Sequence, residues 1–318
     1  MKTIGVDLGG SHVMAALIDE EGKIGPQAET DIEDRTFDAV VDTVVATVRK
    51  ALSDAGQREI PPIGVGSPGN VDLDTGAIRY SPNFGWSNVP LGARLSDKLG
   101  AKVLVGNDAR CATLGEHTFG TGRNVANFVM LTLGTGIGGG IVAENTLLLG
   151  NSDGAGEFGH HQIRATDGFI CGCGKIGCFE AQASGTGLLR HAFAVAPSFP
   201  ASSLLQKRDK LGSKMIRKAA EAGDAHALAA WNRYIDDLAI GLANVIAFVN
   251  PAVIALGGGV SSAGAFMIDA VLPKVDVLTT MVPRGQTSIV AAALGNDAGA
   301  IGASVMARRG GLIAAHAP

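Results

Sequence analysis

The chain has 318 residues, of which 46% are hydrophobic and 18% charged, so it can bury the cores of about two domains and is not intrinsically disordered. Its 26 basic and 30 acidic residues give a net charge of −4 at pH 7, which argues against a nucleic-acid-binding surface. Glycine, with 45 residues, is about twice as frequent as in an average protein. Several glycines follow strand-like segments directly, which is typical of turns where the backbone approaches a ligand.

Neither a signal peptide nor a membrane span is predicted. Met1 is followed almost at once by the segment IGVDLGG, without the hydrophobic stretch of a leader. The hydrophobic residues 238–256 are interrupted by Asn250 and Pro251. We therefore expect a cytoplasmic protein with no membrane partner and no nucleic-acid partner.

The first half of the chain alternates strand-like and helix-like segments, which predicts an α/β sheet. The first two strands are expected to be joined by a glycine turn. Hydrophobic residues at three- and four-residue steps predict the first helix. In chain order the expected elements are strands at 4–8 and 13–17, a helix at 31–54, a strand at 63–66, a loop at 81–90, a strand at 103–105 and a helix at 109–117.

The second half begins with another strand, glycine turn and strand, which indicates a loose internal duplication. A polar, proline-containing segment predicts an excursion loop, and a long amphipathic segment that stops at Asn250-Pro251 predicts a helix. We expect the tail after Arg309 to be loosely held. The expected elements are strands at 128–133 and 141–142, a loop at 197–212, a helix at 225–249, a strand at 253–256 and a helix at 297–308.

The glycine turns are the first candidate for chemistry. Gly134-x-Gly136-x-x-Gly139 matches the dinucleotide fingerprint of a dehydrogenase, but that fingerprint must open a helix, whereas Ile141 and Val142 predict a strand. A plain glycine-rich hairpin would explain one such turn. Two turns, at 7–12 and 133–140, together with the glycines 257–259, favour backbone amides that bind the phosphates of a nucleotide.

Two acidic positions lie at the ends of predicted strands. Asp7 follows the first strand, where a carboxylate can hold Mg²⁺ or can simply cap its own turn. Asn107 and Asp108 lie where a strand gives way to a helix, and both residue types are preferred helix N-caps. Asp108 is also a candidate general base, with Asn107 as a hydrogen-bonding partner for a polar substrate, and both interpretations can hold at once.

The most specific pattern is Glu157-x-x-His160 followed by Cys171-x-Cys173-x-x-x-x-Cys178. One imidazole and three thiolates form a closed tetrahedral Zn²⁺ site, which is structural because no position remains for a catalytic water. Three free buried thiols are the alternative. The spacing alone does not distinguish His160 from the adjacent His161.

Taken together, the segments IGVDLGGSH, GVGSPGNVD, SPNFGW, VGNDARCATLGE, LTLGTGIGGG, GEFGHH, CGCGKIGCFE and ALGGGV occur in an order that resembles the ROK sugar-kinase family. The resemblance extends from Ile4 to about Arg308. It implies an α/β fold of the two-domain actin/hexokinase (ribonuclease H-like) type with an interdomain cleft. We expect a small domain of residues 1–118 plus 299–318 and a large domain of residues 119–298 that carries the zinc motif.

The resemblance also implies roles for individual residues. Asp108 would be the catalytic base that accepts the proton of a sugar hydroxyl as it attacks the γ-phosphorus of ATP. The sugar would be bound by Gly69, Asn83, Asn107, Asp108, Glu157, His160 and Glu180. ATP and its Mg²⁺ would be held by Asp7, Gly9, Gly10, Ser11, Gly134, Thr135, Gly136, Gly257, Gly258 and Gly259. Structural Zn²⁺ would be held by His160, Cys171, Cys173 and Cys178.

Glucose is the expected sugar, because Asn70 and Asn83 look more like the glucokinase branch of the family. The chain departs from the family at Ser11-His12, where a lysine usually follows the hydroxyl residue. Kinases for fructose, mannose, allose or an N-acetylhexosamine, and a sugar-sensing protein without activity, are the alternatives. The partners implied are a sugar and ATP, with a homo-oligomer (dimer or tetramer) as the expected assembly.

Overall fold

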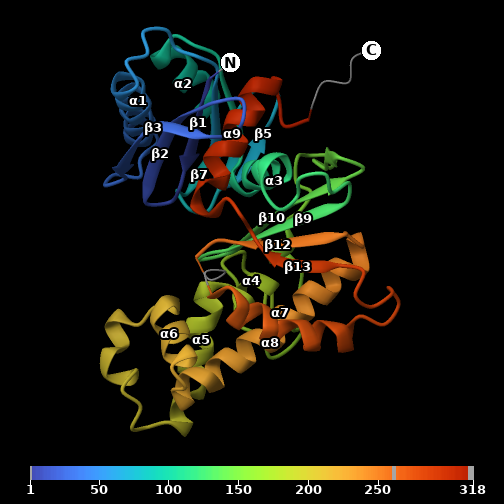
Figure 1. The fold of residues 1–318 in the computed structure, drawn as a ribbon. Helices are drawn as coiled ribbons and strands as arrows, with labels where there is room; N and C mark the ends of the chain where they lie inside the picture. The colour runs from blue at the N-terminus through green and yellow to red at the C-terminus, as the bar shows by residue number, and fades with distance from the viewer. Residues whose placement is uncertain (1, 260–262, 314–318) are drawn as a thin grey trace. The chain divides into compact units, whose positions relative to one another are not determined.

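The computed structural model describes residues 2–259 and 263–313, which group into two compact units (Figure 1). The first unit contains the residues up to Ala126, the segment Gly140–Gly156 and the described residues from Ala293 onward. The second contains Asn127–Gly139 and Glu157–Ala292.

The first unit is built on a five-stranded sheet of order β3-β2-β1-β4-β8 and a three-stranded sheet of order β5-β6-β7. β1 runs parallel to β4, and β4 parallel to β8, whereas β2 and β3 are antiparallel. The elements are β1 (Thr3–Leu8), β2 (His12–Ile18), β3 (Ile24–Asp31), α1 (Phe37–Asp54), β4 (Ile63–Ser67), β5 (Asn70–Asp72), β6 (Ala77–Ser81), β7 (Trp86–Val89), α2 (Leu91–Leu99), β8 (Val103–Asn107), α3 (Asp108–Phe119), the 3₁₀-helix η5 (Gly295–Asp297) and α9 (Ala298–Arg309).

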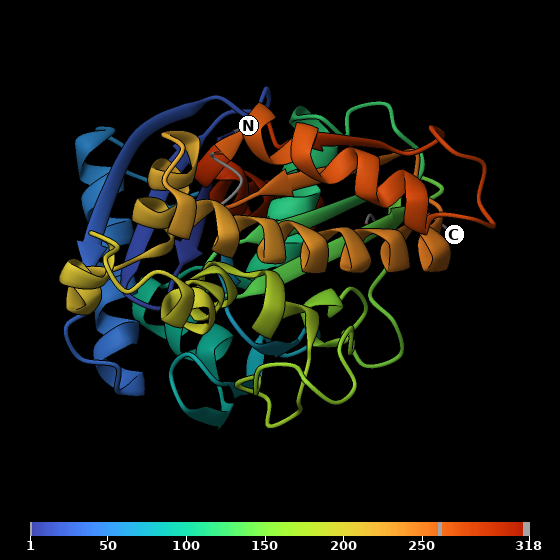
Figure 2. The same cartoon turned by 90° about the horizontal axis from the view of Figure 1, so that it is seen from below.

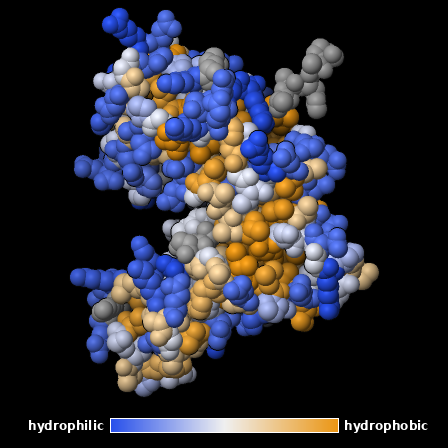
Figure 3. Space-filling model, in the orientation of Figure 1, coloured by the Kyte–Doolittle hydropathy of each residue, from blue (hydrophilic) through white to orange (hydrophobic). Residues whose placement is uncertain are grey.

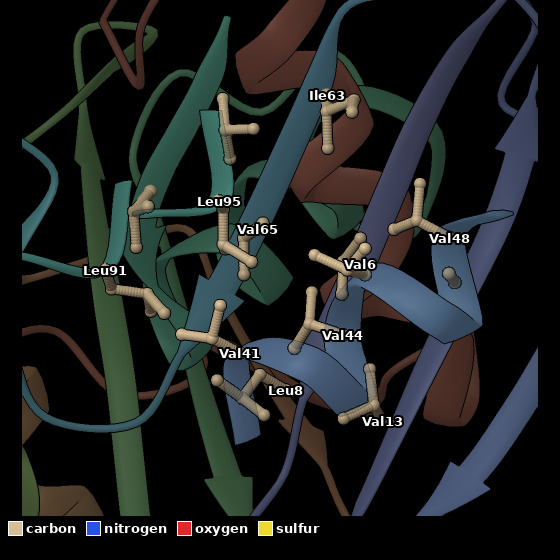
Figure 4. Close-up of a cluster of buried hydrophobic side chains, with 14 of the residues drawn as sticks. Val6, Leu8, Val13, Val41, Val44, Val48, Ile63, Val65, Leu91 and Leu95 are labelled. Atoms are coloured by element: carbon tan, nitrogen blue, oxygen red, sulfur yellow. The ribbon is translucent and has the colours of Figure 1, made fainter. Parts of the chain in front are cut away.

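The two faces of the five-stranded sheet are covered by different helices. Alternate residues of β1, such as Val6, pack against α1 in a fully buried core that also includes α2 (Figure 4). On the other face of the sheet, glycines meet α9. A Cβ atom on Gly5 would lie 1.9 Å from the carbonyl oxygen of Ala300, and one on Gly64 equally close to that of Ala303. Glycine at these positions therefore lets the backbone of α9 lie directly on the sheet.

The second unit contributes β9, β12, β13 and the start of β10 to a sheet of order β11-β10-β9-β12-β13, whereas β11 and the rest of β10 belong to the segment 140–156 of the first unit. In the second unit α7 lies beside α8 (Figure 2). The elements are β9 (Phe128–Leu133), β10 (Ile137–Ala143), β11 (Thr146–Leu147), η1 (Phe158–His160), α4 (Phe179–Ala183), α5 (Gly185–Val195), η2 (Ala196–Ser198), η3 (Leu205–Lys210), α6 (Ser213–Glu221), α7 (Ala225–Val249), β12 (Val253–Gly257), α8 (Ala265–Leu278) and β13 (Ser288–Ala291).

Several expectations are confirmed. The two five-stranded sheets have corresponding orders, with the last two strands parallel in each, which fits the predicted internal duplication. The long helix has the expected bounds, because Asp224 caps its first turn and Asn250 ends it in the left-handed conformation (φ 47°). The excursion at 197–212 contains only short 3₁₀ turns.

Other expectations are wrong. The helix expected from Asp31 begins at Phe37, because Asp31 ends β3, which pairs with β2, and Asp34 closes a turn onto the Thr36 amide at 2.8 Å. The loop expected at 81–90 contains β7, which forms a hairpin with β6. Strand β10 begins at Ile137, four residues earlier than expected. Leu312 in the tail is buried, and residues 314–318 lie outside the described part.

The observed division differs from the expected one chiefly in the segment 140–156. This segment was assigned to the large domain, but it packs on the first unit. Gly140 lies against the Thr113 side chain, and Asn145 donates its amide to the carbonyl of Ala126. Likewise, the amide of Leu294 donates a hydrogen bond to a carboxylate oxygen of Glu116 in α3. This bond attaches the residues before α9 to the first unit.

Hydrophobic residues gather on the surface of the second unit around β12 and β13 (Figure 3). In the chain between these two strands, at and just after the end of α8, Val277, Leu278 and Met281 are exposed, Met281 almost completely. Among the described residues, no helix combines the length and hydrophobicity needed to cross a bilayer. Exposed hydrophobic residues of this kind can form a contact between two copies of a chain.

Candidate active site and metal centre

The polar residues of the first unit meet at one edge of its sheet. The parallel strands β1, β4 and β8 end side by side, with Asp7 paired to Gly66 and Ser67 paired to Asn107. In open α/β sheets this carboxyl edge is where ligands bind. The register therefore brings Asp7 and the Asn107-Asp108 pair to the same edge, as a reading of the strand ends predicts.

Asp108 is the first residue of α3, and its carboxylate has a fixed position. Its Oδ1 accepts hydrogen bonds from the Ala109 amide at 2.8 Å and from Asn107 Nδ2 at 3.0 Å. Asn107 caps the helix by accepting the Arg110 amide at 3.1 Å. The capping interpretation of Asn107 is thus confirmed. Asp108, the residue after this cap, is half-buried at the N-terminus of α3, where the helix dipole stabilises a negative charge.

Asp7 faces the beginning of α9, where a Cβ atom on Gly299 would lie 2.9 Å from its carboxylate. Burial, and secondly the charge of Asp108, raise the pKa of Asp7 from 3.8 to about 7. A carboxylate is the kind of oxygen ligand that Mg²⁺ prefers, and a bound cation would favour the ionised form of Asp7. The residues present therefore fit the expected magnesium site.

The first glycine turn joins β1 to β2 at the same edge. The Gly9 amide donates to the carbonyl of His12 at 3.0 Å, and Ser11 is exposed. The His12 ring lies beside Ser11, with 3.3 Å between Nδ1 and the hydroxyl, and 3.9 Å from a carboxylate oxygen of Glu29. His12 thus lies between the Ser11 hydroxyl and the Glu29 carboxylate, at the position where the resemblance to the family leads one to expect a lysine.

The predicted sugar-binding loops lie on the same side of the first unit. Gly69 has φ 113° and its Cβ would lie 2.4 Å from the carbonyl of Tyr80, so the turn requires glycine. Its own carbonyl accepts Asn107 Nδ2 at 3.1 Å, which links the loop to the base of α3. Asn83 is exposed, with its Nδ2 3.5 Å from the Cβ position of Gly10.

In the second unit two glycine segments meet at the carboxyl edge of the parallel strands β9 and β12. Gly257 pairs with Thr132, and a Cβ on Gly258 (φ 85°) would lie 2.8 Å from the Leu133 carbonyl. The turn Gly134–Gly136 follows β9 directly and leads into strand β10. The dehydrogenase alternative is therefore wrong, because it requires a helix after these glycines.

Glu180 on α4 contacts that turn. Its Oε2 accepts the Ile137 amide at 2.9 Å, and a Cβ atom on Gly136 would lie 2.3 Å from the same oxygen. Its Oε1 lies 3.6 Å from Cys171 Sγ. The N-terminus of α5 holds the turn as well, since Thr186 donates its hydroxyl to the Thr135 carbonyl at 2.9 Å.

The predicted zinc ligands come together. One donor atom from each of the four residues lies within 4.8 Å of the others, with 3.7 Å between Cys171 Sγ and His160 Nδ1 and 3.6 Å between Cys173 Sγ and Cys178 Sγ. Burial raises the pKa of Cys171 to about 12, so a cation would have to stabilise its thiolate. Three thiols and one imidazole at this spacing fit tetrahedral Zn²⁺.

The structure also separates the two adjacent histidines. His160 belongs to the cluster, whereas His161 turns away from it and places Nδ1 2.5 Å from the Phe158 carbonyl. His160 ends the short helix η1, which begins directly after the exposed Glu157. The phenyl ring of Phe179 packs near the His161 ring, with 5.2 Å between the ring centres.

Two arginines that the sequence motifs did not single out anchor the segment before Glu157. Arg110 is buried and donates Nε and Nη2 to the Ala155 carbonyl at 3.0 and 2.8 Å. Arg79 on β6 bonds to the Ser152 carbonyl and pairs with Asp153 at 3.4 Å. Only the position of Arg110, two residues after Asp108, could have drawn attention to it.

Comparison with known proteins identifies the chain. The model of the ROK family matches residues 3–310. This protein belongs to the ROK family. A glucokinase from Thermotoga maritima is 38% identical over 311 residues, covering 96% of both chains. The crystal structure of a ROK family glucokinase from Streptomyces griseus in complex with glucose and AMPPNP is 35% identical, with a TM-score of 0.87 over 97% of this chain and 99% of that one.

The family also contains regulators. The xylose repressor of Bacillus subtilis is 27% identical over 95% of this chain and 76% of its own length. The similarity in structure to the Streptomyces griseus enzyme assigns this ROK protein to the actin/hexokinase type of fold, as expected. The sheet of order β3-β2-β1-β4-β8 carries the first glycine turn, and the corresponding sheet of order β11-β10-β9-β12-β13 carries the second.

Proposed function

We propose that this ROK protein is an ATP-dependent glucokinase that forms glucose 6-phosphate, with Asp108 as the general base. The observation that carries the proposal is the fixed carboxylate of Asp108 at the start of α3, at the sheet edge it shares with Asp7 and the first glycine turn. The similarity to the Thermotoga maritima and Streptomyces griseus glucokinases supports glucose as the acceptor and ATP as the donor.

The chemistry follows from this position. Asp108 accepts the proton of the sugar hydroxyl while the hydroxyl oxygen forms a bond to the γ-phosphorus of ATP. The bond from that phosphorus to the bridging oxygen breaks, and ADP leaves with the electron pair. A carboxylate is basic enough, because the hydroxyl becomes acidic only as the new bond forms. Hydrogen bonds from Ala109 and Asn107 to Oδ1 keep the carboxylate oriented for this transfer.

We propose that both glycine segments of the second unit and the turn of the first bind the nucleotide through backbone amides. The residues are Gly9, Gly10, Ser11, Gly134, Thr135, Gly136 and Gly257–Gly259. Asp7 would hold Mg²⁺, which neutralises charge on the phosphates when it is bound. Ser11 supplies a hydroxyl beside the turn, and the ring of His12 takes the place of the usual lysine.

The sugar-binding residues are proposed for each unit separately. In the first unit Gly69, Asn83, Asn107 and Asp108 would bind hydroxyl groups, and the contact from Asn107 to the Gly69 carbonyl supports a shared role. In the second unit Glu157, His160 and Glu180 would do so. The cluster of His160, Cys171, Cys173 and Cys178 would hold a structural Zn²⁺ that fixes the loop carrying these residues.

A panel of sugars tests the proposal. The purified protein is given ATP and Mg²⁺ with glucose, mannose, fructose, allose and N-acetylhexosamines, and ADP formation is measured. We expect glucose to have the highest kcat/KM. A higher value for another hexose would keep the kinase and change its substrate. ADP formation no faster than in the absence of sugar would rule out the kinase and favour a sugar-sensing role.

We also propose a homo-oligomer in the cytoplasm. Val277, Leu278 and Met281 expose hydrophobic surface at the end of α8, which a second copy could cover. Three thiols gathered with a histidine, rather than paired in disulfides, suit a reducing compartment. Sedimentation of the native protein and of a Met281→Lys variant tests the assembly, since the charge should shift the equilibrium toward monomers if this surface is the contact.

A further inference from the structure

The loop of residues 160–178, here called the metal loop, is tied to the helices of the second unit by an ion pair. Arg164 Nε and Nη2 each lie 2.7 Å from Oδ1 of Asp237. Asp237 is in the middle of α7 and is fully buried, whereas the Arg164 side chain is 35% exposed. A buried, ionised carboxylate needs a positively charged partner, because the transfer of the carboxylate out of water costs several kcal/mol.

A histidine completes the group. His191 on α5 places Nε2 3.1 Å from Asp237 Oδ2 and 3.1 Å from the carbonyl oxygen of Gln182. The hydrogen bond of Nε2 is to the Gln182 carbonyl, whereas Asp237 Oδ2 lies close to Nε2 without forming a hydrogen bond among the described residues. The His191 ring also packs edge-on against Phe169 of the metal loop, with ring centres 5.0 Å apart. The group therefore joins the metal loop to α5, α7 and the end of α4.

Arg164 lies where the metal loop closes on itself. The amides of Ile163 and Arg164 both donate to the carbonyl of Gly177, at 2.8 and 3.1 Å. Gly177 has φ 72°, and a Cβ atom there would overlap the Arg164 carbonyl. Gly177 immediately precedes Cys178, and His160 lies four residues before Arg164. Fixing Arg164 thus fixes both halves of the metal loop and the donor atoms at its two ends.

We propose that Arg164, Asp237 and His191 are positioning residues that hold the metal loop in its ligating shape. Through it they hold Glu157 and His160 for the sugar. The second part of this inference rests on the proposed function, whereas the first concerns only the metal. Arg164 suits the task because its planar guanidinium directs two donors at one carboxylate, which a lysine cannot do.

The two charges are not equivalent, which makes the proposal testable. Asp237→Asn leaves an arginine that reaches solvent, so the fold should tolerate it. Arg164→Met leaves a buried carboxylate with His191 as its remaining ion-pair partner among the described residues, which is the more damaging change. The double variant Arg164→Met, Asp237→Asn should be more stable to heat than Arg164→Met alone, because it removes the unpaired charge.

A neighbouring residue supplies a matched control. Asp236 precedes Asp237 on α7 and pairs with Lys274 of α8 at 2.6 Å, but both members of this pair are about half exposed. Asp236→Asn therefore removes one carboxylate of an ion pair from the same helix and leaves the hydrogen bond from Arg164 to Asp237 in place. Surface pairs of this kind contribute little to stability. Comparing Asp237→Asn with Asp236→Asn therefore separates the effect of losing the buried ion pair from the effect of removing a negative charge from α7.

The decisive measurement is the release of zinc from the native, metal-loaded protein to a chelating dye. We expect Asp237→Asn to release zinc about ten-fold faster or more, as for other residues that orient metal ligands, and Arg164→Lys to lie between it and the wild type. Asp236→Asn should match the wild type. Equal rates for Asp237→Asn and Asp236→Asn, or no zinc in the native protein, would overturn the proposal.

Kinetics then separate this role from general damage. In Asp237→Asn the KM for glucose should rise about ten-fold while the KM for ATP stays within about two-fold. Equal changes in both constants would contradict a role in positioning the sugar residues. If no sugar is phosphorylated by the wild type, the proposed function fails. The zinc-release result would still decide whether the three residues hold the metal loop.

Discussion

Glu180 links the metal cluster to the second glycine turn, because one carboxylate oxygen accepts the Ile137 amide at 2.9 Å while the other lies 3.6 Å from Cys171 Sγ. The same side chain is therefore in contact with a segment proposed to bind phosphate and with a proposed zinc ligand. A substitution that moves either the glycine turn or the metal cluster should therefore also alter the contacts of the other.

Gly136→Ala tests this link. The added methyl group would lie 2.3 Å from Glu180 Oε2, so the flexible carboxylate must leave the Ile137 amide. We expect the free energy of unfolding to fall by about 1.5–3 kcal/mol, the contribution of a hydrogen bond to a carboxylate. Gly134→Ala is the control for stability, since nothing lies within 4 Å of its Cβ position. Thermal melting of both variants provides the measurement, and equal melting temperatures would contradict the link.

Asp108→Asn should lower kcat for glucose phosphorylation at least about a hundred-fold. The amide keeps an oxygen for the Ala109 and Asn107 hydrogen bonds but cannot accept the proton of the sugar. The protein should remain folded, as seen by circular dichroism. Asp97→Asn, on the exposed face of α2, should retain wild-type turnover. Asp108→Asn with more than about a tenth of wild-type activity would remove the base from the mechanism.

The native protein should contain one zinc per chain. Cys173→Ser should lower the zinc content, the melting temperature and the affinity for glucose together, because the ion holds the loop that carries His160. Cys111 is buried outside the cluster, so Cys111→Ala should keep its zinc. Elemental analysis of the three proteins gives the answer. Normal zinc content in Cys173→Ser would exclude that thiol as a ligand.

The raised pKa of Asp7 makes stability depend on pH. Between about pH 4 and 7 the folded protein keeps a proton on Asp7 that the unfolded chain has lost, so the free energy of unfolding falls as the pH rises through this window. Above pH 7 the full loss in the free energy of unfolding, about 4 kcal/mol, remains. Asp7→Asn should therefore raise the melting temperature at pH 8 much more than at pH 5, in EDTA and without nucleotide.

The control for this experiment is Asp54→Asn, because Asp54 is exposed and pairs only with Lys50 among the contacts described for it. Its melting temperature should differ from the wild type by the same small amount at both pH values. If Asp7→Asn behaved in the same way, Asp7 would titrate normally in the folded protein and the proposed cause, burial beside Asp108, would be wrong.

The elements that were predictable from the sequence are those whose own residues contain the hydrophobic pattern, the cap or the ligand spacing that defines them. The helix Ala225–Val249 has a hydrophobic stripe, a capping aspartate and a terminal Asn-Pro, and its bounds were predictable. The four zinc ligands lie within 19 residues, so spacing sufficed to find them. Strand β3 was missed because its outward-facing residues make it largely polar, and only its pairing with β2 makes it a strand.

Contacts between distant residues were beyond such patterns. Arg164 and Asp237 are 73 positions apart, and neither lies in a motif that suggests the other. Arg110 is similar, since its bond to Ala155 depends on how the segment 140–156 folds back onto α3. The ambiguity between His160 and His161 also needed coordinates, because adjacent side chains point in directions that spacing does not encode.

Helix α9 has a consequence for how the protein is made. It covers the face of the first sheet where Gly5 and Gly64 meet the backbone of Ala300 and Ala303. The ribosome releases every residue of the second unit before this helix, so the strands synthesised first are the last to be completed. Until then the nascent sheet exposes an uncovered face to chaperones, and a chain interrupted before Ala298 leaves it so permanently.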